Sequence, residues 1–206
     1  MIKYTVAVPI NQVTEARRTC KALKKGIEML RAELAKLDEV DPIRDGIAAR
    51  DRAEADRQRI NNDIEETKAD IAQQIREQSN IYQAEVNRQA AMKGEDLDTA
   101  DYALIRDNLI SDATQLQMMA DRNKNNYTLL VAIDHYATAQ GWTGFAVISN
   151  APNVEAFGKA WFDMCETAAR NPDGLAMMQI TTEGELRRLL NEYGVLDVAQ
   201  LPDDEA

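Results

Sequence analysis

Apolar residues follow two different periods in the first part of the chain. From Met1 to Ile10 they occupy every second position, the pattern of a β-strand with one buried face, and Pro9 favours an edge or an end. From Val13 the spacing changes to alternating steps of three and four, which is the pattern of a coiled-coil helix. This stripe predicts a long first helix, and its members are Val13, Ala16, Cys20, Leu23, Ile27, Leu30, Leu34 and Leu37.

A second long helix is predicted after a reversal of the chain at Asp41-Pro42. Proline disfavours a helical conformation for the residue before it and suits the first turn of a new helix. The segment from Ile43 to about Met92 contains no proline, and its isoleucines continue a helical stripe. The stripe includes Ile43, Ile47, Ile60, Ile64, Ile71, Ile75 and Tyr82.

The two predicted helices differ in length. At about 1.5 Å per residue the second measures about 75 Å and the first about 40 Å. Residues 60–82 therefore extend past the first helix and need another apolar surface. Either the C-terminal half of the chain or another subunit supplies it. A seam this narrow favours self-association, through Cys20, Leu23, Ile27, Leu30, Leu34, Leu37, Ile60, Ile64, Ile71 and Ile75.

Shorter helical segments fill the rest of the chain. Residues 145–148 form the other strand-like run, and they could pair with residues 2–8. We therefore expect a mainly α fold: a long antiparallel helical hairpin (coiled coil), a compact C-terminal bundle of short helices and at most a two- or three-stranded small sheet. The expected division is a strand plus hairpin at 1–94 and a compact acidic helical region at 95–206, packed on the distal end of the long helix.

Composition narrows the classes of function. The chain has 206 residues, 45% of them hydrophobic, and its 24 Lys/Arg against 35 Asp/Glu give a net charge of −11. This charge argues against direct binding to nucleic acid or to an anionic membrane. We expect neither a signal peptide nor a transmembrane segment, because no apolar run approaches the about 20 residues that a span requires.

The charge is unevenly distributed. Residues 1–40 carry eight Lys/Arg and five Asp/Glu, whereas residues 95–206 carry seven and nineteen. A basic N-terminal helix and an acidic C-terminal half are able to attract each other, within one chain or between copies. The basic cluster consists of Arg17, Arg18, Lys21, Lys24 and Lys25.

Residues capable of catalysis are few. His135 is the one histidine, and its neighbour Asp134 points about 100° away on a helix, so the pair predicts a partly buried structural histidine rather than a dyad. Cys20 lies in the apolar stripe and Cys165 in a helical apolar segment, where thiols behave as small hydrophobic groups. The sequence thus predicts no enzyme, no catalytic residue and no cofactor.

One acidic cluster carries the oxygen ligands that a hard cation prefers. Its spacing is not that of a calcium loop, and helix capping accounts for it better, so we expect no metal site. The cluster consists of Glu95, Asp96, Asp98 and Asp101.

Five of the eleven aromatic residues fall within twenty-one positions. Their helical spacing indicates a core face, and the alternative is a docking surface for a partner. We take Trp142, Phe157 and Trp161, together with the basic cluster, as candidate partner-binding residues.

The segment from Asn87 to Trp142 contains a series of short polar and helical stretches: Asn87-Arg88-Gln89, Gly94-Glu95-Asp96-Leu97, Asp112-Ala113-Thr114-Gln115-Leu116, Met119-Ala120-Asp121-Arg122-Asn123, Asn125-Asn126-Tyr127-Thr128, Tyr136-Ala137 and Gly141-Trp142. In this order they resemble small proteins encoded in the head-assembly region of tailed bacteriophages and prophages. Those proteins combine a coiled-coil N-terminal part with a compact helical part, so the resemblance implies a structural or assembly role. The acidic C-terminus departs from scaffolding proteins, which often present a basic C-terminal helix.

Two functional hypotheses follow. The first is a non-enzymatic structural protein of a phage particle (minor head, capsid-associated or scaffold-like), which binds itself and another phage structural protein in the virion or, during assembly, in the host cytoplasm. The second is an acidic phage regulator or anti-defence inhibitor that blocks a basic nucleic-acid-binding groove. The number of copies in purified virions separates the two.

Overall fold

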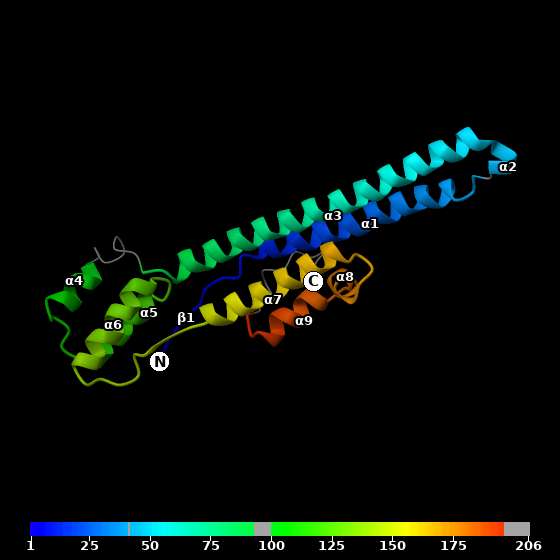
Figure 1. The fold of residues 1–206 in the computed structure, drawn as a ribbon. Helices are drawn as coiled ribbons and strands as arrows, with labels where there is room; N and C mark the ends of the chain where they lie inside the picture. The colour runs from blue at the N-terminus through cyan, green and yellow to red at the C-terminus, as the bar shows by residue number, and fades with distance from the viewer. Residues whose placement is uncertain (41, 93–99, 196–206) are drawn as a thin grey trace. The chain divides into compact units, whose positions relative to one another are not determined.

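A computed structural model describes residues 1–40, 42–92 and 100–195, and it is mainly α-helical with one small parallel sheet, as predicted. Figure 1 shows the elements in chain order. They are β1 (Ile2–Tyr4), α1 (Ile10–Leu37), α2 (Pro42–Asp45), α3 (Ile47–Ala90), α4 (Ala100–Arg106), α5 (Ala113–Arg122), α6 (Tyr127–Ala139), β2 (Val147–Ser149), α7 (Ala151–Arg170), α8 (Leu175–Thr181) and α9 (Glu185–Glu192).

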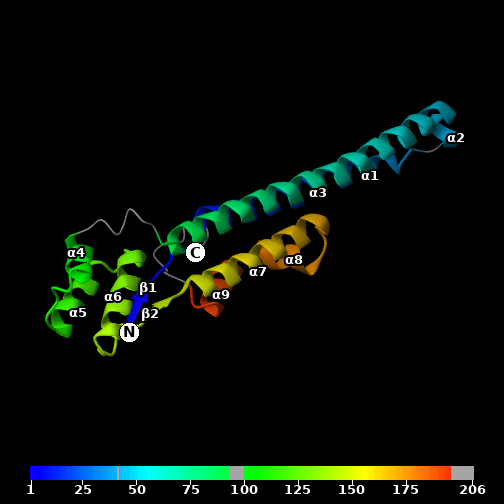
Figure 2. The same ribbon diagram turned by 60° about the vertical axis from the view of Figure 1, so that its left-hand side comes forward.

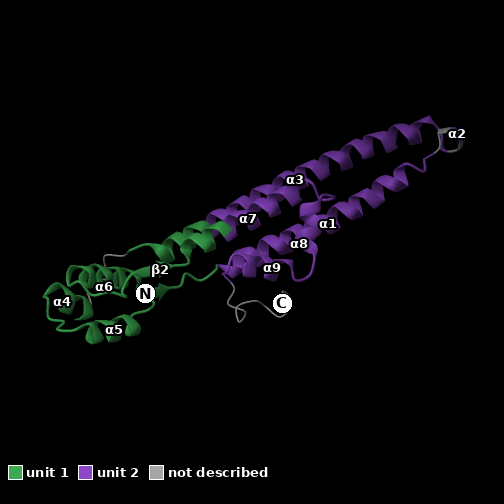
Figure 3. Cartoon of the chain, turned by 90° about the horizontal axis from the view of Figure 1, so that it is seen from below, with its two compact units in different colours: residues 1–8, 83–156 green, residues 9–82, 157–206 purple. Residues whose placement is uncertain are grey.

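The chain forms two compact units, coloured separately in Figure 3. The first contains residues 1–8 and 83–156, and the second contains residues 9–82 and those from 157 onward. These units cut across the expected division into 1–94 and 95–206, because α7, α8 and α9 group with the hairpin. The expected boundary itself, between residues 94 and 95, lies outside the described residues.

The second unit is built on the predicted hairpin. In Figures 1 and 2, α1 and the first part of α3 lie side by side along their length, joined by the short α2. Near the turn, Arg57 Nη2 of α3 donates to Asp38 Oδ1 at 2.6 Å. The apolar stripe of α1 is buried from Val13 to Ile27 and half-buried from Leu30 onward. The stripe is therefore the contact between two helices of one chain.

Helix α7 packs against both long helices of the second unit. The ring of Tyr82 on α3 meets the ring of Phe162 on α7 edge to face, with 5.4 Å between centroids. Trp161 of α7 donates its ring N–H to the Val13 carbonyl of α1 at 3.1 Å. The sequence left open whether the C-terminal half of the chain or another subunit covers the distal part of the second helix. The structure shows the C-terminal half of the same chain in contact with it, at Tyr82.

The N-terminal strand belongs to the first unit and is shorter than predicted. Residues 2–4 pair in parallel with 147–149, so the predicted pairing is confirmed and lies within the chain. The side-chain alternation continues to Val8, but the ladder ends at Tyr4. Beyond it the Asn150 side chain bonds the backbone of Val6, accepting from its N–H at 2.7 Å and donating to its carbonyl at 3.1 Å.

Helices α5 and α6 of the first unit begin at side-chain caps. Asp112 accepts from the Gln115 N–H at 2.9 Å, and Asn126 accepts from the Leu129 N–H at 2.9 Å. The ring of Tyr127, at the start of α6, lies 4.8 Å from that of Tyr4 in β1. These contacts tie the sheet to the helices of this unit.

Candidate functional site

The residues with possible catalytic chemistry do not come together. His135 is exposed on α6, which corrects the expectation of a partly buried histidine. Cys20 and Cys165 are both buried, with the Cys20 thiol donating to the Cys165 carbonyl at 3.7 Å. Burial, followed by the neighbouring Cys20 thiol, raises the pKa of Cys165 well above its ordinary value, so the reactive thiolate is disfavoured at neutral pH.

Within the described ranges, no group of three or more His, Cys, Asp or Glu side chains is placed to hold a metal ion. The acidic residues Glu95, Asp96 and Asp98 lie outside those ranges. Asp101 accepts from Arg122 Nη2 at 3.1 Å and from Asn123 Nδ2 at 2.6 Å.

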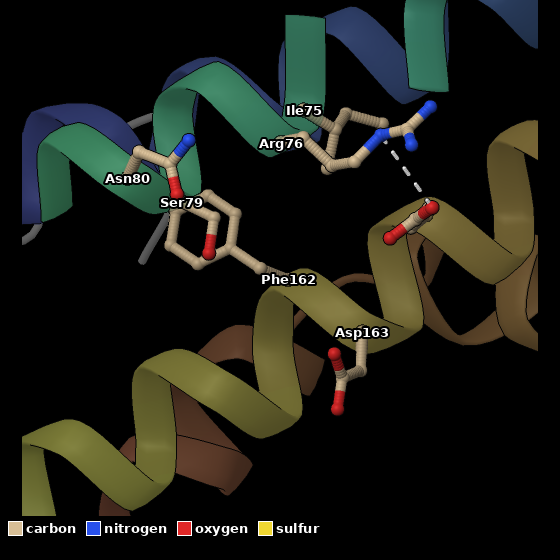
Figure 4. A pocket seen from close by; sticks show the side chains of 7 residues that line it. Ile75, Arg76, Ser79, Asn80, Phe162 and Asp163 are labelled. Carbon is tan, nitrogen blue, oxygen red and sulfur yellow. Dashed lines mark ion pairs between the residues drawn. The ribbon is translucent and has the colours of Figure 1, made fainter. Parts of the chain in front are cut away.

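A hollow of about 150 Å³ lies between α3 and α7 in the second unit. Arg76 of α3 forms an ion pair with Glu166 of α7, with 3.7 Å between Nε and Oε1, and a dashed line from Arg76 marks this pair in Figure 4. Glu166 also pairs with Arg170, and Asp163 pairs with Lys159 at 2.7 Å. Each charged group of this hollow thus has an ion-pair partner, and the arrangement is that of a helix–helix contact with a polar rim.

The predicted self-association seam lies largely inside the chain. Six of its ten members are buried, which corrects their assignment to a contact between copies: Cys20, Leu23, Ile27, Ile60, Ile64 and Ile75. The other four are half-buried: Leu30, Leu34, Leu37 and Ile71. Only this second group retains apolar surface for a second copy.

The basic cluster of α1 is divided by the fold. Arg17 is 2% exposed, and it donates from Nε to the Ile180 carbonyl and from Nη2 to the Thr182 carbonyl, each at 2.9 Å. This corrects its assignment to a partner surface, because its guanidinium binds the C-terminal end of α8. The rest of the cluster is exposed or half-buried on α1: Arg18, Lys21, Lys24 and Lys25.

A sequence signal for the burial of Arg17 existed. On a helix, Arg17 follows Val13 by one turn and precedes Cys20 by three positions, so it shares a face with two buried residues. That face meets the C-terminal helices, as the Trp161 and Cys165 contacts show.

The aromatic candidates are core residues. Phe157 and Trp161 are fully buried on α7, and their rings stack with 6.4 Å between centroids. Trp142 is half-buried against Tyr136, with 5.9 Å between ring centroids. The core face that their spacing indicates is thus confirmed for Phe157 and Trp161, and their assignment as candidate partner-binding residues is wrong.

The two-helix end of the hairpin is the surface that the sequence did not reveal. We call residues 32–40 and 42–64 the arm. Near Arg31 the hairpin meets Asp173, with two hydrogen bonds of 2.6 Å; beyond it, α1 and α3 continue without a third helix in the described part of the chain (Figures 1 and 2). Ile43 is 96% exposed and Ile47 is 72% exposed. Both were expected in the buried stripe.

The break between α2 and α3 explains this correction for Ile43. Gly46 has φ 88°, so the helical phase of residues 42–45 is not continued into α3. Ile47 belongs to α3 and lies about 220° around that helix from Ile60, at 100° per residue. The apolar stripe starts instead at Ala53, Ile60 and Ile64, which face α1.

Comparison of this chain with protein-family models, with curated proteins and with solved structures finds no match. None of the described helices combines the length and the apolar character needed to cross a bilayer.

Proposed function

We propose that this chain is a non-enzymatic structural or assembly protein that acts through self-association and protein–protein contacts. The arm is the observation that supports this function. It presents Ile43 and Ile47 to solvent and leaves Leu34 and Leu37 half-buried. A second arm packed against it buries these side chains in a four-helix arrangement, in which the two copies use the same surface.

The energetic gain from this contact is moderate. Full burial of a Leu or Ile side chain contributes about 1.5–3 kcal/mol, and the arm offers four such side chains, two of them already half-buried. Charged residues of both signs surround them, among them Arg50, Asp51, Arg52 and Glu54. Mixed charges permit close approach of identical surfaces, because each cation has an anion available on the other copy.

We further propose that the protein is a component of a tailed-phage particle, in a minor head, capsid-associated or scaffold-like position. The resemblance of residues 87–142 to phage head-region proteins supports this placement. Its second partner is another phage structural protein, and Arg18, Lys21 and Lys25 offer that partner an exposed basic surface on α1.

Sedimentation velocity across a wide range of protein concentration tests the self-association. The variant Ile43→Glu/Ile47→Glu introduces charge into the arm at exposed positions, so we expect it to remain folded and to become monomeric. The matched control is Leu175→Glu/Met178→Glu on α8, where the side chains are 70% and 59% exposed; it is expected to associate like the unsubstituted protein. A monomer at all concentrations, or equal loss of association in both variants, contradicts the proposal.

Quantitative mass spectrometry of purified virions tests the phage assignment. We expect several copies in each particle that a phage encoding this chain produces. Absence from both virions and assembly intermediates would reject the virion role.

A further inference from the structure

The small sheet of the first unit has an edge that the described residues do not pair. The sheet consists of β1 and β2 alone within the described ranges, and its register aligns Ile2 with Val147 and Tyr4 with Ser149. Ile2 donates to the Ala146 carbonyl at 2.9 Å, and Asn150 donates to the Tyr4 carbonyl at 3.4 Å. In a parallel ladder with these bonds, residues 2 and 4 point their backbone groups toward β2. The N–H and carbonyl of Lys3 therefore point to the opposite edge.

The segment around β1 is held in place by hydrogen bonds to Gly144 and Gln89. The Met1 amino group donates to the Gly144 carbonyl. The Tyr4 hydroxyl donates to the Gln89 carbonyl at 2.6 Å, and the Ala7 N–H donates to Gln89 Oε1 at 2.8 Å. A strand that is ordered before binding lowers the entropic cost of adding a partner strand.

An open hollow of about 520 Å³ lies next to this strand. Residues 1–3 line one side, and the other is lined by Gln117, Ala120 and Asp121 of α5 and by Lys124 just after it. Its volume falls within the range of about 300–1,000 Å³ that is typical of binding pockets. A groove with a strand edge on one side and a helix on the other suits an extended peptide, because the strand supplies backbone hydrogen bonds and the helix contacts its side chains.

The charges of the hollow indicate what kind of peptide fits. Lys3 and Lys124 are both exposed, and neither makes an ion pair in the described part of the chain. The one carboxylate, of Asp121, accepts from Gln117 Nε2 at 2.9 Å. In a chain of net charge −11, this is a local excess of positive charge. Acidic side chains of an extended segment are attracted to both lysines.

We propose that the groove between β1 and α5 binds an extended acidic segment of a partner protein, which adds to the free edge of β1 as a strand. The affinity comes from hydrogen bonds to the Lys3 backbone, and the preference for acidic segments comes from the Lys3 and Lys124 side chains. This site lies in the first unit and does not depend on the arm.

Fluorescence anisotropy with the full chain tests the site. The probe is a labelled peptide of alternating Asp and Val. One comparison peptide replaces each Asp by Lys, and another carries N-methyl groups on alternate residues, which removes the donors needed to pair with β1. We expect binding of the Asp–Val peptide, and weaker binding of both comparison peptides by at least about tenfold, which corresponds to about 1.4 kcal/mol.

Protein variants locate the binding. We expect Lys3→Glu/Lys124→Glu to lower the affinity for the Asp–Val peptide by about tenfold or more. The control Lys21→Glu/Lys25→Glu on α1 changes the net charge of the chain by the same amount and is expected to bind the peptide normally. Equal weakening by the two variants would show general electrostatic attraction and overturn the proposal. So would equal binding of the N-methylated peptide, since it would exclude strand addition.

A residue-level measurement gives an independent result. Hydrogen exchange of the Lys3 amide is expected to slow when the Asp–Val peptide is present. Binding that leaves this amide unchanged would place the peptide elsewhere and reject the site.

Discussion

Replacing Gly158 by alanine tests the close contact between α7 and α3. A Cβ atom at this position would lie 2.1 Å from Cε1, 2.7 Å from Cδ1 and 2.8 Å from Cζ of the Tyr82 ring. Non-bonded heavy atoms do not approach a Cβ atom this closely, so the ring or the helix must move. Tyr82 is fully buried and packs edge to face on Phe162, which leaves its ring little room.

The magnitude follows from two opposing effects. Alanine in place of glycine inside a helix contributes about 0.8–1 kcal/mol of helix propensity. Overpacking of a filled core costs about 1–3 kcal/mol. We therefore expect Gly158→Ala to lower the free energy of unfolding by up to about 2 kcal/mol.

A matched control is provided by Gly26, which also lies inside a long helix. A Cβ atom there has no heavy atom within 4 Å, so Gly26→Ala is expected to raise the free energy of unfolding by up to about 1 kcal/mol. The helix-propensity gain is common to both variants. Their difference, about 1–3 kcal/mol, thus reports the contact of Gly158 with Tyr82.

Urea denaturation followed by tryptophan fluorescence measures these changes. In a Trp142→Phe background the signal comes from Trp161, which is buried in the second unit beside the contact. A Tyr82→Leu background removes the ring, so the penalty of Gly158→Ala is expected to shrink there. If Gly158→Ala is as stabilising as Gly26→Ala, or if its penalty is unchanged without the ring, the packing interpretation is refuted.

Three further predictions concern single side chains. Arg17→Leu leaves two α8-end carbonyls without their charged donor, so it should lower the free energy of unfolding by about 2–4 kcal/mol in urea denaturation, and wild-type stability would contradict this. The hydrogen bonds from Arg31 lower the pKa of Asp173, so the stability they add is present at neutral pH and is lost as pH falls through that lowered pKa. In Asp173→Asn, the urea midpoint should therefore decrease less steeply at acid pH than in the unsubstituted protein. An unchanged dependence of the midpoint on pH would exclude the linkage. Cys20 and Cys165 should react with a thiol reagent only as urea unfolds the chain, and rapid labelling of the native protein would show that the thiols are accessible.

The long-range contacts set the limit of what sequence patterns predict here. The heptad spacing of α1 predicts the hairpin because both of its helices are neighbours in the chain, and the alternation at 2–8 predicts a strand for the same local reason. The position of α7 against α3 depends on contacts such as Tyr82 with Phe162, for which no local periodicity exists. The burial of Arg17 is of the same kind, because it depends on the position of α8.

The candidate surfaces show the same distinction. Helical spacing identified the residues of the seam, but not whether they meet another part of the chain or a second copy. Exposure of Ile43 follows from the break at Gly46, a backbone angle that spacing does not encode, whereas Ile47 lies about 220° around α3 from Ile60 at 100° per residue. The free edge of β1 depends on which backbone groups β2 leaves unused, and that is a property of the register.

The alternating membership of the two units has a consequence for biosynthesis. The chain passes from the first unit to the second at residue 9, returns at 83 and leaves again at 157, so neither unit is a continuous segment. On a ribosome that adds about 5–20 residues per second, the hairpin emerges well before the helix that covers Tyr82. The nascent hairpin therefore exposes apolar side chains for several seconds, and chaperone binding is expected in that interval. Shortened chains that end before α7 are expected to aggregate for the same reason.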